Sequence, residues 1–194
     1  EEKSGDGSPY IEASSAILIE ANSGRVFFEQ NADDKRYPAS TTKVMTAVLA
    51  LEALDPAAVA TASQTAVDVD RDGSNMGILS GEELTVEQLL YGLLVHSAND
   101  AANVLAEQVS GSIEAFVELM NTKAAELGMK DTHFVNTHGY HDDNHYTTAR
   151  DMAKLALYAV QNETFQKIVS TATYDIPPTN KYTKVRNLSN NNAL

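Results

Sequence analysis

The chain has 194 residues and a formal net charge of −13. This length is enough for one large domain or two small ones, and so acidic a chain argues against a nucleic-acid partner, because phosphates would be repelled. The chain contains no cysteine, which excludes disulfide bonds, a thiolate nucleophile and a cysteine-ligated metal. No apolar run approaches the roughly 20 residues that a membrane-spanning helix needs.

The first twelve residues are polar and lack the basic and then apolar pattern of a signal sequence. We therefore expect a flexible terminus over residues 1–12, followed by one domain over residues 13–194. Residues 13–30 predict a β-hairpin, because two apolar runs flank the turn signal at residues 22–24. Each run is almost continuously apolar, which predicts that both faces of the hairpin are buried.

Six further segments predict helices from apolar spacing and from capping residues at their starts. They are residues 41–54, 84–95, 100–109, 113–127, 149–160 and 163–170. Thr85 and Gln88 stand at capping-box spacing in the second segment, whose leucines predict a central core helix. Residues 57–83 are expected to form loops and short strands. Residues 173–176 form the single later strand that we predict, and the tail from residue 187 is polar.

An early hairpin, a block of helices and a later strand describe an α+β fold, with the helical block packed on an antiparallel sheet. The hairpin needs strand partners, because a lone hairpin is marginal in water. With a single later strand visible, we expect the remaining strands of the sheet to be missing from these residues. An unpaired sheet edge would also favour association with another segment or chain.

Ser40 and Lys43 are the candidate nucleophile and base of an acyl-transfer site. Their i, i+3 spacing places both on one face of a helix. Ser40 lies at the first turn, where free backbone N–H groups and the helix dipole would stabilise an oxyanion. Lys43 can take the serine proton only when it is neutral, and burial beside the leucine-rich helix would lower its pKa.

The pair alone is equally typical of an ordinary helix start, with Ser40 as the N-cap and Lys43 as a solvated lysine. A second group of residues favours the catalytic interpretation. Ser97 and Asn99 fall in a tight break between two predicted helices, where a hydroxyl and an amide could face Lys43. There they would relay a proton and hold an amide group of the substrate.

Four segments resemble the penicillin-recognising serine D,D-peptidases, specifically the low-molecular-weight D-alanyl-D-alanine carboxypeptidases of the peptidase S11 type. These segments are 37–46 (YPASTTKVMT), 96–101 (HSANDA), 134–139 (FVNTHG) and 145–153 (HYTTARDMA). The likeness begins near residue 13 and continues to the end, so it covers nearly the whole chain. It implies a β-lactamase/D,D-peptidase-like fold, with the site at the junction of the helices and the sheet.

The resemblance also implies a reaction that uses no metal or cofactor. Ser40 would attack the carbonyl between the two terminal D-alanines of a peptidoglycan pentapeptide, with Lys43 as its base. Ser97 would pass the proton to the leaving amine, and Asn99 would orient Lys43 and the substrate. Water would then release the acyl group. β-Lactam antibiotics would act as covalent inhibitors, and such an enzyme would work outside the cytoplasmic membrane, in the bacterial cell envelope.

One motif of this family, Lys-Thr-Gly on a sheet strand, is absent from these residues. Lys123 is followed by Ala124 and Lys184 by Val185, so neither lysine supplies it. The resemblance places the motif just beyond residues 187–194. Three explanations stay open: a missing continuation, which we favour; a second chain or segment that supplies the strands; and a non-catalytic penicillin-binding relative.

The alternative enzyme is a class A-like β-lactamase, which needs an acidic residue to position the deacylating water. For this role the loop over residues 132–146 offers Asp142 and Asp143. Three histidines between residues 138 and 145 suggest zinc, but their spacing fits no strong signature, so we expect a surface loop whose histidines bond backbone groups. The acidic residues 68–72 lack the calcium-loop pattern, so we expect a solvated loop there.

Overall fold

The computed structural model describes residues 11–190 and residue 192, so most of the predicted N-terminal tail, residues 1–12, lies outside the described residues. The elements in chain order are β1 (Ala16–Ile19), β2 (Val26–Gln30), the 3₁₀ turn η1 (Ala39–Thr42), α1 (Lys43–Ala53), β3 (Val59–Thr61), α2 (Gln64–Val67), β4 (Glu83–Thr85), α3 (Val86–Val95), α4 (Asn99–Ser110), α5 (Ile113–Glu126), α6 (Ala149–Ala159), α7 (Glu163–Val169), β5 (Thr173–Ile176) and β6 (Arg186–Ser189). This mixture confirms the predicted α+β class. The domain boundary at residue 13 stays a prediction.

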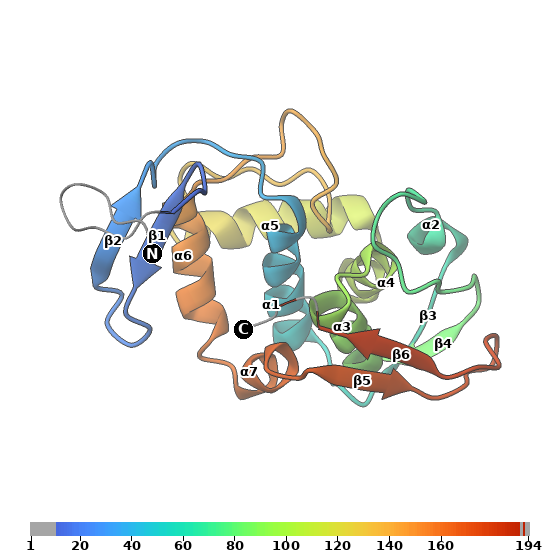
Figure 1. Cartoon of the computed structure of the whole chain (residues 1–194). Coiled ribbons are helices and arrows are strands. Elements are labelled where there is room, and N and C mark those ends of the chain that lie inside the picture. The colour runs from blue at the N-terminus through green and yellow to red at the C-terminus, as the bar shows by residue number, and fades with distance from the viewer. Residues whose placement is uncertain (1–10, 191, 193–194) are drawn as a thin grey trace.

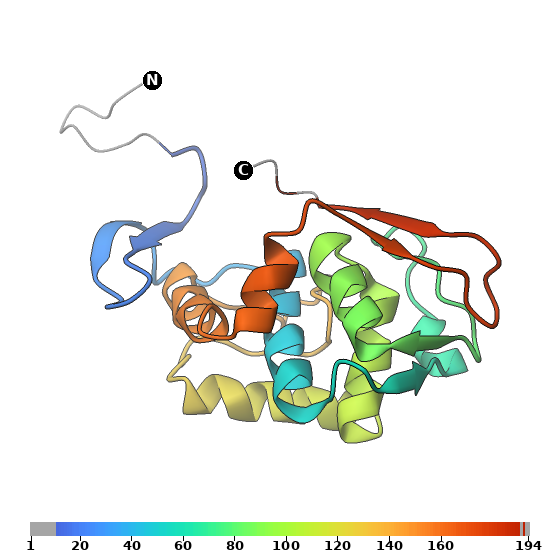
Figure 2. The same cartoon turned by 90° about the horizontal axis from the view of Figure 1, so that it is seen from below.

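Helix α1 runs through the middle of the molecule, with α3 and α4 on one side and α6 on the other (Figure 1). The β1–β2 hairpin lies beyond α6 at one end, while the pairs β3–β4 and β5–β6 lie at the opposite end, as Figure 2 shows from below. Each pair is a separate two-stranded antiparallel sheet. Fully buried side chains such as Met45, Leu89, Leu105 and Phe116 come from four of the helices. The core is therefore helical, and the strand pairs lie around it.

The β1–β2 hairpin forms as predicted, with Leu18 opposite Phe28. The prediction that both of its faces are buried is wrong, because Leu18 is 56% exposed and Phe27 is 57% exposed. Helix α6 packs against the hairpin from one side. Since strand side chains alternate between the two faces, the residues that point away from α6 remain in solvent.

The strands after α7 show that a second prediction, a single later strand, is wrong. Strand β6 pairs with β5 in antiparallel register, so the chain has more than the single later strand that we predicted. Its alternate residues Arg186 and Leu188 are buried, which is the pattern of a half-buried strand. The polar tail concealed this pattern, because the buried Arg186 carries a charge and its partner, Glu82, lies far away in the sequence.

The helix ends follow the predicted signals closely. Thr85 and Gln88 form a reciprocal capping box at the start of α3, and the Thr148 side chain caps α6. Two starts differ: the residues from 41 onward first form η1 and the α-helix begins at Lys43, and residues 84 and 85 belong to β4, so α3 begins at Val86. Among the helices between residues 11 and 190, none has the length and apolar character that crossing a bilayer requires.

Candidate active site

Ser40 and Lys43 lie together at the start of α1, as their spacing predicts. Ser40 belongs to η1 and is exposed, while Lys43 is the first residue of α1 and is only 2% exposed. The Lys43 Nζ atom donates hydrogen bonds to Ser40 Oγ at 3.1 Å and to the His138 carbonyl oxygen at 2.9 Å. An exposed hydroxyl group therefore lies directly beside a buried amine.

Burial lowers the pKa of Lys43 to about 8, because the surrounding protein disfavours the charged form, as predicted. The carboxylate of Asp100 acts in the opposite direction and favours the ammonium form. An amine with this pKa is partly neutral near neutral pH, and a neutral amine keeps one lone pair that can accept a proton. In that form the hydrogen bond between Ser40 and Lys43 reverses, and the serine hydroxyl becomes the donor.

The loop that carries the His138 carbonyl is fixed on α1 by buried hydrogen bonds. The Thr46 hydroxyl donates to the Thr137 carbonyl oxygen at 2.6 Å, and Thr42 Oγ1 lies 2.8 Å from His145 Nε2. Buried polar groups are costly unless they are paired, so each of these bonds favours a single loop position. The carbonyl that contacts Lys43 is therefore held in place from both sides.

Gly139 brings the same loop against the residue that precedes Ser40. It has a φ of +89°, and a Cβ atom at this position would lie 1.8 Å from the Ala39 carbonyl oxygen. Ala39 itself has a φ of +47°, which is uncommon for a residue with a side chain. The close approach of these two backbone segments therefore fixes the position from which Ser40 reaches the solvent.

Ser97 lies in the predicted break between α3 and α4, with a φ of +61° in the left-handed region. Ser40, Lys43 and Ser97 line one groove with a volume of about 370 Å³. The other walls come from η1, α1, α3, α7 and the C-terminal segment, through Thr41, Val44, Leu93, Leu94, Phe165, Val169, Asn190 and Asn192. The structure therefore brings together three of the four predicted site residues.

Asn99, the fourth predicted residue, is not among the residues that line this groove. It is the first residue of α4, is 5% exposed, and donates its backbone N–H to the Ser74 carbonyl oxygen at 2.8 Å. Its side-chain amide packs against Gly73, where a Cβ atom would lie 2.5 Å from Nδ2. A direct role of the Asn99 amide toward the substrate stays a prediction.

Two groups that influence Lys43 were not predicted from the sequence. One is the His138 carbonyl, which leaves no signal because every residue carries a carbonyl group. The other is Asp100, which is buried and accepts hydrogen bonds from the N–H groups of Met76 at 3.2 Å and Ile78 at 2.9 Å. An acidic residue directly after Asn99, at the start of an apolar helix, was a signal that could have identified it.

Two of the three histidines between residues 138 and 145 bond backbone groups, as we expected, whereas His141 contacts the Asp143 side chain, and His145 is buried rather than at the surface. His145 Nδ1 accepts the Val135 N–H at 3.1 Å, and His138 Nδ1 accepts the Tyr140 N–H at 3.2 Å. Burial lowers the pKa of both rings to about 4, so both are neutral at neutral pH. In the described part of the chain, no three His, Asp or Glu side chains are grouped so that they could hold a metal ion.

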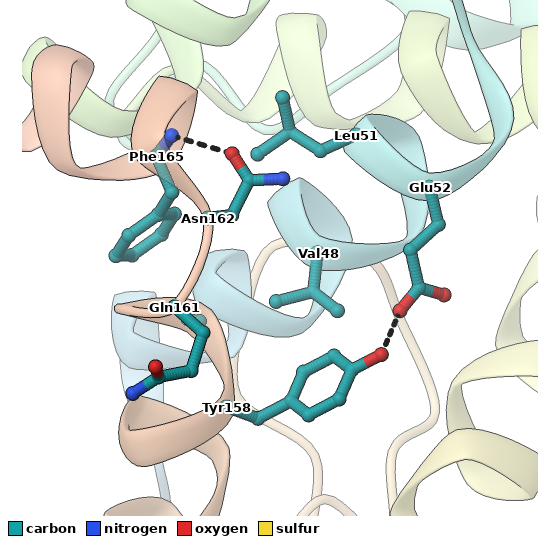
Figure 3. Close-up of a pocket in the computed structure, with 8 residues that line it drawn as sticks. Val48, Leu51, Glu52, Tyr158, Gln161, Asn162 and Phe165 are labelled. Atoms are coloured by element: carbon teal, nitrogen blue, oxygen red, sulfur yellow. Dashed lines mark hydrogen bonds between the residues drawn. The ribbon is translucent and has the colours of Figure 1, made fainter. Parts of the chain in front are cut away.

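A second hollow, of about 280 Å³, lies toward the other end of α1 and contains none of the predicted site residues. Side chains from α1, α6, α7 and the loop between the last two surround it (Figure 3). The Tyr158 hydroxyl donates to the Glu52 carboxylate, and the Asn162 side chain accepts the Phe165 N–H. These polar groups are engaged with one another, so the groove at Ser40 is the better candidate for an active site.

A family model described as D-alanyl-D-alanine carboxypeptidase, peptidase S11, matches residues 2–194. The chain is 40% identical over 163 residues to the D-alanyl-D-alanine carboxypeptidase DacF of Bacillus subtilis. It is 40% identical over 156 residues to the D-alanyl-D-alanine carboxypeptidase DacA of Escherichia coli. These alignments cover 82% and 76% of this chain but 42% and 39% of the two relatives, so the chain spans about two fifths of their length.

Solved structures extend the likeness to the fold. The Streptomyces K15 DD-transpeptidase matches with a TM-score of 0.88 at 33% identity, over 96% of this chain and 76% of that protein. A D-alanyl-D-alanine carboxypeptidase from Mycobacterium tuberculosis H37Rv matches with a TM-score of 0.87 at 29% identity, over 99% of this chain and 72% of that protein. The family model, the relatives and the fold agree, and the chain belongs to the peptidase S11 family of D-alanyl-D-alanine carboxypeptidases.

Proposed function

We propose that this chain carries most of the active site of a serine D,D-carboxypeptidase, which removes the terminal D-alanine from peptidoglycan stem peptides. The observation that carries the proposal is the buried Lys43 amine, hydrogen-bonded to Ser40 Oγ and with its pKa lowered to about 8. The substrate class follows from relatives named D-alanyl-D-alanine carboxypeptidase. Because that substrate is part of the cell wall, the enzyme would work outside the cytoplasmic membrane.

In the acylation step, Ser40 Oγ attacks the carbonyl carbon of the penultimate D-alanine while its proton passes to the neutral Lys43 amine. The new C–O bond leaves a negative charge on the carbonyl oxygen, which backbone N–H groups at the start of the helix stabilise. The C–N bond to the terminal D-alanine then breaks, and the leaving nitrogen takes a proton. Ser97, which lines the same groove, delivers that proton from Lys43.

In the second step, water attacks the ester carbonyl carbon, the shortened peptide leaves, and Ser40 regains its proton. A β-lactam would acylate the same oxygen, but its leaving nitrogen stays attached through the opened ring. A carboxylate that positions a water molecule beside the ester would speed the hydrolysis of this acyl-enzyme. None of the residues that line the groove within the described part of the chain is acidic.

The β-lactamase alternative needs a carboxylate that positions the deacylating water, and neither Asp142 nor Asp143 supplies it. The Asp143 side chain is 88% exposed and accepts a hydrogen bond from the Tyr37 hydroxyl, and Asp142 accepts the Asn144 N–H. Both oxygens of the buried Asp100 are taken by backbone N–H groups. We therefore expect a long-lived penicilloyl-enzyme rather than rapid turnover.

The test is labelling of the whole protein with a fluorescent penicillin, together with an assay for D-alanine release from a stem pentapeptide. Wild-type protein and a control with Ser23→Ala, an exposed serine in the β1–β2 turn, should label and release D-alanine equally. Ser40→Ala should abolish both signals. Labelling that survives Ser40→Ala would refute the proposed nucleophile, and rapid loss of the label by hydrolysis would favour the β-lactamase.

A further inference from the structure

Ser97 has a backbone conformation that its neighbours must maintain. Its φ of +61° lies in the left-handed region, which residues with a side chain enter rarely. Such conformations persist only where surrounding contacts hold them, and they cluster at functional sites. Ser97 also lines the groove beside Ser40 and Lys43, so the direction of its side chain matters for the reaction.

Ser74 contacts the chain on both sides of Ser97. The Ser74 hydroxyl donates to the His96 carbonyl oxygen at 2.8 Å. The Ser74 carbonyl oxygen accepts the Asn99 N–H, also at 2.8 Å. One residue therefore joins the last residue before the turn to the first residue of α4, and these two bonds restrain Ser97 and Ala98 between them.

The segment that carries Ser74 is itself fixed. It lies between α2 and β4 (Figure 1), and its next residues give their N–H groups to the buried Asp100 carboxylate. From the other side, Arg186 donates to the carbonyl oxygens of Met76 at 3.1 Å and Gly77 at 3.0 Å. Ser74 is thus attached to a rigid support rather than to a free loop.

We propose that Ser74 is a positioning residue, which holds Ser97 in the orientation that delivers a proton to the leaving amine. The hydrogen bonds of Ser74 reach His96 and Asn99 rather than Ser40 or Lys43, so Ser74 acts through the backbone of residues 96–99. This inference rests on the proposed function, because it requires an amide substrate with a leaving nitrogen. It assigns a role to a residue outside the four segments that carry the family resemblance.

The test compares two substrates that differ in their need for a proton. An acyl-D-alanyl-D-alanine peptide releases an amine, which must be protonated, whereas the matching thioester releases a thiolate, which can leave without one. Ser74→Ala removes the bond to His96 and keeps the backbone carbonyl. In the whole protein, this variant should lower kcat for the amide about tenfold, because misplacing Ser97 removes part of the rate increase that general acid catalysis provides. It should change kcat for the thioester less than about twofold.

Two further variants separate positioning from folding. Ser74→Thr restores the hydroxyl and should recover amide turnover. Ser63→Ala is the matched control, because it removes a serine that caps α2 and bonds Glu107 but does not contact the Ser97 turn. It should also lower thermal stability, while leaving the ratio of amide to thioester turnover unchanged.

The outcomes are distinct. Equal loss with both substrates in Ser74→Ala, or no loss with either, would overturn the positioning role. A structure of Ser74→Ala in which Ser97 keeps its left-handed φ would overturn it as well. Failure of the wild-type protein to turn over either substrate would instead refute the proposed function, and the role of Ser74 with it.

Discussion

Arg186 and Glu82 form a buried ion pair in which two guanidinium nitrogens meet two carboxylate oxygens, at 2.6 Å and 2.8 Å. Glu82 is fully buried and Arg186 is 6% exposed. The pair joins β6 to the segment before β4, which are far apart in the sequence. We expect Glu82→Ala to lower the free energy of unfolding by about 3–5 kcal/mol, because Arg186 is left buried and uncompensated. Urea denaturation measures the loss.

A double variant provides the control for this prediction. Glu82→Met combined with Arg186→Met replaces both charges by apolar side chains and leaves no buried charge unpaired. It should cost much less than Glu82→Ala, because well-packed apolar replacements of a buried pair are often neutral or stabilising. If the double variant is as unstable as the single one, packing rather than the lost charge partner explains the effect.

The same carboxylate predicts how stability depends on pH. Burial alone would raise the pKa of Glu82, but hydrogen bonds from Arg186, Thr179 and the Leu79 N–H hold it below its ordinary value of 4.5. A carboxyl with a lowered folded-state pKa stabilises the fold above 4.5, and this contribution disappears as the pH falls through the folded-state pKa. Wild-type stability should therefore fall more steeply on acidification than that of Glu82→Gln, and a parallel decline would contradict the assignment.

The lowered pKa of Lys43 predicts how the rate of acylation depends on pH. Its amine accepts the Ser40 proton only when neutral, so the acylation rate should rise with pH through about 8. Lys43→Arg should abolish acylation, because a guanidinium does not deprotonate in this range. Stopped-flow labelling with a fluorescent penicillin measures the profile, and a rate independent of pH between 7 and 9, roughly one unit on either side of this pKa, would exclude Lys43 as the base.

Asp100 should shift that profile. Its negative charge favours the ammonium form of Lys43, so Asp100→Asn should move the rising limb to lower pH. The matched control is Asp151→Asn, which removes another buried carboxylate, one that accepts the Asp131 N–H and pairs with Lys154. The control should reduce stability without moving the limb, and equal shifts in both variants would point to a general effect of charge.

Two glycines form a matched pair for the contact before Ser40. Gly111 has a φ of +79°, and no atom lies within 4 Å of the place that a Cβ atom would take, so Gly111→Ala should cost only the left-handed penalty of about 1–2 kcal/mol. Gly139→Ala adds a clash with the Ala39 carbonyl oxygen. It should be more destabilising and should also slow penicillin labelling, which Gly111→Ala should leave unchanged. Thermal unfolding and labelling rates measure the two effects.

Local signals explain what could be predicted from the sequence. The capping box of Thr85 and Gln88 and the spacing of Ser40 and Lys43 depend on residues three positions apart, so they are visible in the chain itself. Strand β6 was missed because its stability depends on Arg186 reaching Glu82 more than a hundred residues away. The burial of the β1–β2 hairpin was misjudged because an apolar run does not tell how many of its faces another element covers.

The candidate site shows the same difference between local signals and contacts of distant residues. The four candidate side chains could be named from short motifs, and three of them share one groove. The His138 carbonyl and the Ser74 contacts could not be named, because they are tertiary contacts between backbone groups and distant residues. Short motifs thus named the candidate side chains, while the contacts made by the His138 carbonyl and by Ser74 required the fold.

The greater exposure of Ser40 relative to Lys43 also bears on which of the two side chains an acyl group reaches. A neutral amine is a stronger nucleophile than a hydroxyl, and an acyl group captured by Lys43 would form an amide that water releases far more slowly than an ester. Because Lys43 is 2% exposed and Ser40 is exposed, an incoming carbonyl carbon meets the oxygen first. In the proposed reaction, this difference in depth between two residues one helical turn apart would keep the acyl group on the serine and off the lysine.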